Sequence, residues 1–149
     1  MKNIYHLPAS EEILTRIDHL KADLRPEWGQ MNAAQMLAHC SSFQDLAMGH
    51  LSSPRSRLGM IIGRFVKPIF YNEKPLPQNM STIPEIMVND EKEFETEKEK
   101  LKQKIRTHQK DGPEKYPAAI HPFFGKLTPD QWGKGIYKHL DHHLKQFGV

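Results

Sequence analysis

The apolar residues of this 149-residue sequence recur at steps of three and four, the spacing of one face of an α-helix, in four separate segments. No segment shows the alternation of apolar and polar residues that a half-buried strand requires. The pattern therefore predicts an all-α chain. The four predicted helices run from Ser10 to Leu24, from Asn32 to about Gly49, from Asp90 past Ile105, and from Thr128 to Gly148.

Residues with a preference for helix N-termini stand at the starts of these segments. Thr128 is followed by a proline and, three residues on, by Gln131, which together form a capping box with a proline in the first turn. Asp90 with Glu93 suggests the same arrangement for the third helix, and Ser10 is the expected N-cap of the first.

Residues 51–89 interrupt the helical pattern with five prolines. One short helix is expected inside this segment, from about Arg57 to Lys67. A link of this length permits a crossover, so the second and third long helices can run parallel. We expect a single domain over residues 1–149, a four-helix bundle with a long connection at 51–89.

Composition excludes several classes of protein. A net charge of +3 is too small an excess to indicate nucleic-acid binding. The single Cys40 excludes an intrachain disulfide and cysteine-rich metal sites. The first residues lack the apolar run of a signal peptide, and the longest apolar stretch, Leu58 to Gly63, is far too short for stable membrane insertion. We expect a cytoplasmic protein.

Histidine is abundant, with nine residues, and two of them lie on the apolar face of the last helix. At about 100° per residue, with His139 placed at 0°, Trp132 lies near 20°, Ile136 near 60° and His143 near 40°. His142 falls near −60°, outside this arc. His139 and His143 are therefore stacked one turn apart on the core side, the spacing with which two imidazoles chelate one metal ion.

The second helix supplies a third imidazole, His39, one turn before Phe43. Facing helices of a bundle build metal sites in its core, and three neutral imidazoles leave a coordination position for water or substrate. Leu140 stands where a zinc protease of the HExxH type has its glutamate, so that activity is excluded. Each histidine can instead be a hydrogen-bonded core residue, which is the commoner role of a buried histidine.

The other histidines carry weaker signals. His142 and His121 are candidates for supporting the site, His121 from a loop, His-Pro-Phe-Phe-Gly, that either walls a pocket or plugs the end of the bundle. The remaining ones are expected at the surface or at a helix end: His6, His19, His50 and His108.

Three stretches, Trp28 to His39, His121 to Trp132 and Lys138 to His143, resemble the DinB-like superfamily, within it a branch known as a domain of unknown function. The resemblance covers nearly the whole chain. It implies a four-helix bundle with a crossover between helices 2 and 3, and a zinc, nickel or similar ion bound by His39, His139 and His143.

The resemblance also implies candidate activities. Characterised members include metal-dependent transferases and isomerases that use low-molecular-weight thiols, and others are described as hydrolases. We therefore expect a metal-dependent transferase or hydrolase with a small-molecule substrate.

The rival hypothesis is a non-catalytic binding module whose metal site is structural or vestigial. Pro54 to Phe70 mixes four cations with apolar residues, which suits a membrane surface or an acidic partner. The same piece also suits a cap on the bundle or a homodimer contact.

Overall fold

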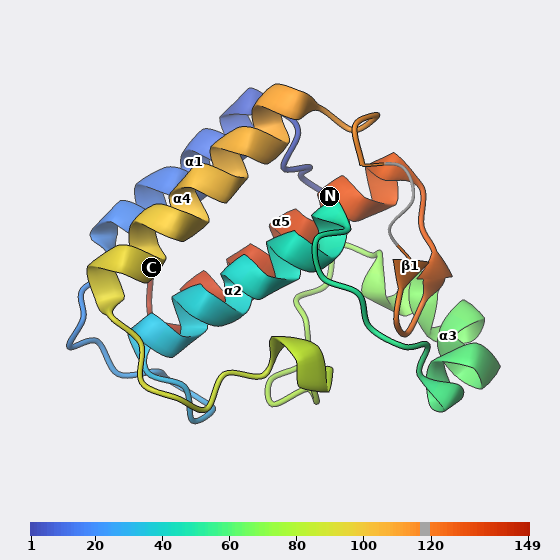
Figure 1. Ribbon diagram of the computed structural model, residues 1–149, viewed down its shortest axis with the longest axis horizontal. Helices are drawn as coiled ribbons and strands as arrows, with labels where there is room; N and C mark the ends of the chain where they lie inside the picture. The colour runs from blue at the N-terminus through green and yellow to red at the C-terminus, as the bar shows by residue number, and fades with distance from the viewer. Residues whose placement is uncertain (117–119) are drawn as a thin grey trace.

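The computed structural model describes residues 1–116 and 120–149 and is mostly helical, as predicted (Figure 1). A two-stranded antiparallel hairpin, in which Ile120 pairs with Lys126 and His121 with Gly125, is the one β element within these ranges. The elements are α1 (Leu7–His19), α2 (Ala33–Met48), α3 (Arg57–Phe70), the 3-10 helix η1 (Pro84–Ile86), α4 (Phe94–Asp111), β1 (Ile120–His121), β2 (Gly125–Lys126) and α5 (Pro129–Gln146).

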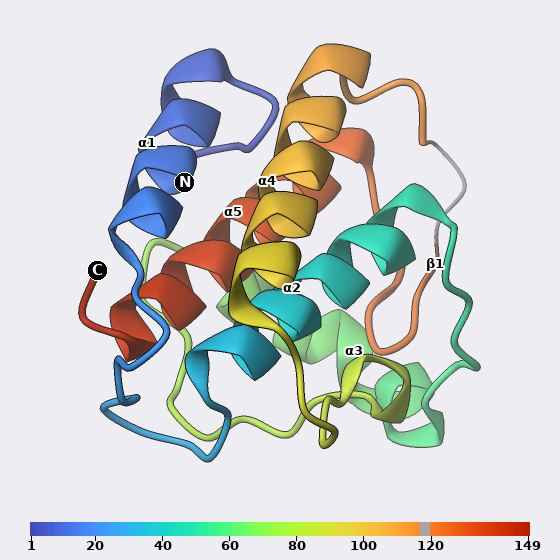
Figure 2. The same cartoon turned by 60° about the vertical axis from the view of Figure 1, so that its left-hand side comes forward.

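The four long helices α1, α2, α4 and α5 enclose one apolar core. α2 packs against α4 and α5, and α1 packs against the same two helices from the other side (Figures 1 and 2). The core is formed by the apolar faces that the periodicity identifies, among them Ile13, Ile17, Met36, Leu101, Ile105, Ile136 and Leu140.

Polar contacts between α2 and α4 show that these helices run parallel. Near the start of α2, the Gln35 amide donates to the carbonyl oxygen of Asp90, just before α4, at 3.2 Å. Further along, Lys104 Nζ donates to Asp45 Oδ2 at 2.7 Å. The start of α2 thus lies beside the start of α4, and later residues of α2 lie beside later residues of α4. Residues 49–93 therefore run from the C-terminal end of α2 back to its N-terminal end. None of the helices in the described ranges is both long and apolar enough to cross a bilayer.

The predicted start of the first helix is wrong. Ser10 is buried within α1, and its hydroxyl donates to the carbonyl oxygen of Leu7 at 3.0 Å. α1 begins at Leu7 because Pro8 is favourable in a first turn, where an amide hydrogen has no partner to lose. It ends at His19, not at the predicted Leu24, since the backbone of Leu20 is extended.

The start of α4 is also displaced from the prediction. Glu93, not Asp90, is the N-cap, and its carboxylate accepts hydrogen bonds from the amides of Glu95 and Thr96.

The expected surface position of His108 is wrong as well. This residue continues the stripe of Leu101 and Ile105 by one further step of three, and it is fully buried.

The other helix boundaries lie close to the prediction. α2 has Asn32 as N-cap in a capping box with Gln35, and Gly49 ends the helix in a left-handed conformation (φ 76°). α3 begins at the predicted Arg57 but continues three residues beyond the predicted end, since Tyr71 N donates to the carbonyl oxygen of Lys67 at 3.0 Å.

The cap of α5 generates a stability prediction. Thr128 Oγ1 accepts from Gln131 N at 3.2 Å, and the Gln131 side chain accepts from Thr128 N at 3.0 Å. Thr128→Ala should lower the free energy of unfolding by about 1 kcal/mol. Thr128→Ser keeps a hydroxyl acceptor at the N-cap, so its stability should stay close to that of the wild type. Urea unfolding followed by circular dichroism measures both. Equal stability of the alanine and serine variants would contradict this role of the cap.

Candidate metal centre

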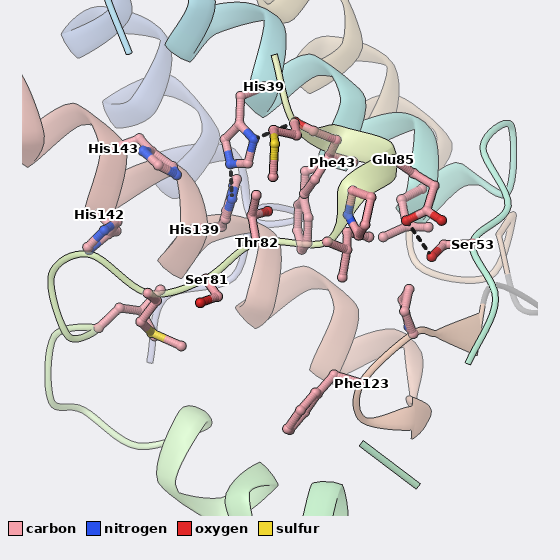
Figure 3. A pocket seen from close by; sticks show the side chains of 18 of the residues that line it. His39, Phe43, Ser53, Ser81, Thr82, Glu85, Phe123, His139, His142 and His143 are labelled. Carbon is pink, nitrogen blue, oxygen red and sulfur yellow. Dashed lines mark hydrogen bonds between the residues drawn. The ribbon is translucent and has the colours of Figure 1, made fainter. Parts of the chain in front are cut away.

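Three histidines from two antiparallel helices meet inside the core (Figure 3). His39 comes from α2, while His139 and His143 lie one turn apart on α5. Their candidate ligand atoms, one from each ring, all lie within 4.8 Å of one another. The closest pair is His39 Nε2 and His139 Nε2, at 3.0 Å. The structure thus brings together the three residues that the sequence selects.

The ring of His39 is held by a backbone carbonyl. Its Nδ1 lies 2.8 Å from the carbonyl oxygen of Ile86, in η1. Because a carbonyl only accepts, Nδ1 must carry the hydrogen, and the neutral ring keeps its lone pair on Nε2. That nitrogen faces His139, so His39 has the tautomer that a metal-binding imidazole needs.

His143 is fixed by a relay through a glutamine. Gln146 Nε2 donates to the carbonyl oxygen of Trp28, which leaves Gln146 Oε1 to accept from His143 Nδ1, at 2.6 and 2.8 Å respectively. The amide orientation follows from the carbonyl, and the histidine tautomer follows from the amide. His143 therefore also keeps its lone pair on Nε2. Carbonyls outside the cluster orient two of the three rings.

His139 is positioned by packing. Its ring stacks on Phe43, with centroids 4.2 Å apart and planes 19° apart. Its Nδ1 is buried and has no hydrogen-bond partner among the described residues. A half-buried imidazole whose buried Nδ1 is unpaired and whose Nε2 faces a second imidazole is costly, and a cation shared by the facing Nε2 atoms offsets part of that cost. This supports the fit of a cation at the cluster.

Burial keeps all three rings neutral. It lowers the pKa of His39, lowers the pKa of His143 to about 3, and lowers that of His139 well below its usual range, with neighbouring imidazoles adding to the shift of the last two. Neutral imidazole is the form that coordinates metal, so the core environment favours ligation over protonation.

The cluster lies in the wall of a cavity of about 1210 Å³. The wall is formed by α2, α3, α5, the hairpin loop and the connection between α3 and η1, where Ser81 and Thr82 lie near the histidines (Figure 3). Among the described residues the lining is mostly apolar, and Arg55 and Glu85 are its charged members. Both are engaged: Arg55 Nε donates to the carbonyl oxygen of Pro122, and Glu85 accepts from the Ser53 hydroxyl.

The two candidate supporting histidines line the same cavity at different places. The His142 ring lies against Trp28 and His143, with centroids 5.5 and 5.1 Å away. His121 packs against Phe43 and the ring of Phe124, one aromatic layer away from His139. No contact assigns either of them a place among the convergent nitrogens.

The hydrogen bonds of His121 restrict its chemistry. Its Nδ1 accepts from the amides of Phe123 and Phe124 at 3.1 and 3.2 Å, so the hydrogen must be on Nε2. Burial lowers its pKa to about 4. In this arrangement His121 can donate a hydrogen bond into the cavity but has no free lone pair with which to act as a base.

Sequence reasoning missed the groups that orient the rings. Gln146 could have been found, because it follows His143 by three residues and therefore shares its helix face. The carbonyl groups of Trp28 and Ile86 carry no sequence signal, since any residue type supplies one. Their roles follow only from the tertiary fold.

A family described as "Protein of unknown function (DUF1569)" matches residues 2–148. No curated protein and no solved structure matches the chain.

The buried histidines predict a loss of stability in acid. The pKa values of His108, His121 and His143 lie at about 4, 4 and 3 in the folded protein. The unfolded chain binds protons below about pH 6.5, whereas the folded chain does not until about pH 4. The free energy of unfolding should therefore fall as the pH falls through this window, by up to about 1.4 kcal/mol per pH unit for each histidine.

Urea unfolding of chelator-treated protein at about pH 7.5 and about pH 5 measures this dependence. Equal or greater stability at the lower pH would contradict the burial of neutral rings.

Proposed function

We propose that this chain, which belongs to the DUF1569 family of proteins of unknown function, binds one divalent transition metal ion, zinc or nickel, through His39, His139 and His143. We further propose that its helices form the four-helix bundle of the DinB-like superfamily. The order of its long helices and the parallel α2 and α4 support that assignment.

One observation carries the proposal: the tautomers of two buried histidines are set by acceptors outside the cluster, so that their lone pairs face inward. His39 donates to the Ile86 carbonyl and His143 to Gln146. Core histidines that serve packing alone have no need of convergent lone pairs, because each unpaired nitrogen costs desolvation energy. A metal ion accepts the inward-facing lone pairs at once.

The site suits catalysis better than structural support. Structural zinc sites are closed by four protein ligands, whereas catalytic sites have three and an open position. Here three histidines border a cavity. Cys40, the one cysteine, does not supply a fourth ligand, because it is buried with its thiol against Met36 Sδ at 3.8 Å. An ion in such a site makes a bound water or thiol a nucleophile near neutral pH.

The residues around the cluster favour thiol transfer over hydrolysis. A hydrolase benefits from a base that takes a proton from water, but Glu85 is hydrogen-bonded to Ser53 and points away from the histidines (Figure 3). His121 has no free lone pair. We therefore favour a transferase that joins a low-molecular-weight thiol to a small molecule.

The cavity also limits the substrate. With both charged wall residues engaged by the protein, the wall offers apolar surface and neutral polar groups. We expect a substrate whose reacting part is uncharged and largely apolar. We propose the cytoplasm as its place of action, because thiol co-substrates are kept reduced there.

The alternative is a non-catalytic module with a structural or vestigial metal site. It predicts that partner binding survives removal of the metal.

In the enzyme proposal, thiol conjugation to electrophilic substrates should occur with the metal-loaded protein and be absent from its His139→Ala variant, as a chromatographic screen of conjugates would show.

Metal content tests the ligand set. Protein purified without a histidine tag should bind about one equivalent of zinc or nickel. His139→Ala and His143→Ala should each remove it, because two imidazoles remain. His19→Ala, at an exposed position on α1, is the matched control and should leave binding unchanged. Elemental analysis after dialysis, with circular dichroism to confirm folding, measures the result. Unchanged metal content in the two α5 variants would refute the assignment.

The hydrogen bonds from His143 through Gln146 to the Trp28 carbonyl should contribute to metal affinity, although Gln146 is not itself a ligand. Gln146→Ala frees the His143 ring to turn and to change tautomer, so metal affinity should fall by about 10- to 100-fold. Gln44→Ala is the matched control, since Gln44 Oε1 bonds a buried histidine outside the site, His108, at 2.7 Å. Calorimetric titration should show normal affinity in Gln44→Ala. An equal loss in both variants would mean that the effect is general destabilisation.

A further inference from the structure

Helix α3 presents an apolar face to solvent. It lies at the edge of the molecule, outside the four long helices (Figures 1 and 2), where β2 packs against it and Lys138 of α5 donates to the carbonyl oxygen of its last residue, Phe70. Ile61 and Phe65 are 70% and 62% exposed, and Leu58 and Met60 are each more than half exposed. These four are half of the large apolar residues that are exposed in the described ranges.

The opposite face of α3 is fixed to the hairpin loop. Gly59 and Gly63 lie against the backbone of Phe123 so closely that a Cβ at either position would be 2.5 Å from its carbonyl oxygen. Near the end of the helix, Lys67 Nζ donates to the carbonyl oxygen of Lys126 at 3.2 Å. Because close packing holds this side, α3 cannot roll to bury its exposed residues without losing these contacts.

Cations lie within the exposed face. At about 100° per residue, with Arg57 at 0°, Arg64 lies near −20°, while Ile61, Phe65 and Leu58 lie near 40°, 80° and 100°. The Arg64 guanidinium lies over the Phe65 ring, 4.5 Å from its centroid.

This surface has no acidic residue to balance its charge. Residues 54–71 contain four cations and no aspartate or glutamate. Among the described residues, none of these cations forms an ion pair with a carboxylate. An apolar helix face with unpaired arginines is complementary to a surface that is apolar inside and anionic outside.

We propose that α3 docks the protein on anionic membrane surfaces, with Leu58, Ile61 and Phe65 entering the boundary between headgroups and acyl chains. Arg57 and Arg64 extend to the lipid phosphates and carboxylates, as long cationic side chains do at an interface. The helix lies in the plane of the membrane and does not cross it. A second copy of the chain fits the surface less well, because two such faces would bring four arginines together.

Vesicle binding tests this proposal. The full-length protein should sediment with vesicles in which about a third of the lipid is phosphatidylserine, and much less with pure phosphatidylcholine. Arg57→Gln with Arg64→Gln should lower the partition constant about thirtyfold, and Ile61→Ser at least about tenfold. The result should be the same with and without chelator, which separates it from the metal proposal.

Matched controls are available on other exposed surfaces. Arg25→Gln with Arg106→Gln removes the same charge, and Leu7→Ser replaces an apolar residue that is 55% exposed on α1. Both should bind vesicles as the wild type does. An equal loss in the controls, or no binding to anionic vesicles, would overturn the proposal. A dimer that dissociates in Ile61→Ser, without vesicle binding, would assign the surface to a second copy instead.

Discussion

The contact between His39 and His139 is the constraint on which the rest of the site depends. Two neutral imidazoles, from antiparallel helices, approach to 3.0 Å at the wall of a mostly apolar cavity. Such a contact is stable only where the remaining ring nitrogens are controlled, because an unpaired polar atom in this environment is expensive. The surrounding residues meet that requirement for two rings, since a carbonyl holds His39 and a glutamine holds His143. The ring of His139 is supported by the stacked Phe43, and its Nδ1 has no partner among the described residues.

The long connection between α2 and α4 gives the histidine cluster its surroundings. It lets the two helices run parallel, and on its way back it places η1 against α2, where the Ile86 carbonyl reaches His39. The same connection forms part of the cavity wall and carries α3 to the outside of the molecule. One proline-rich connection thus supplies a ring acceptor, a wall of the cavity and an exposed amphipathic helix.

Sequence predicted what depends on local periodicity and left out what depends on distant contacts. The four helices and the inward positions of His39, His139 and His143 follow from steps of three and four. The first helix was misplaced because Pro8 is as good a starting signal as a serine cap. His108 continues the stripe of Leu101 and Ile105, but its hydrogen-bond partner, Gln44, lies on another helix and gives no local signal that an imidazole can be buried there. The Ile86 carbonyl was missed because backbone groups carry no identity in sequence. The hairpin strands are two residues long, too short to show alternation.

X-ray absorption spectroscopy of the zinc-loaded protein tests the central claim most directly. If His39, His139 and His143 hold the ion, the spectrum should show nitrogen at about 2.0–2.1 Å, with the outer-shell scattering of three imidazole rings and one further light ligand. His143→Ala should abolish zinc binding, because two imidazoles remain. Sulfur at about 2.3 Å, or a spectrum without imidazole scattering, would contradict the assignment.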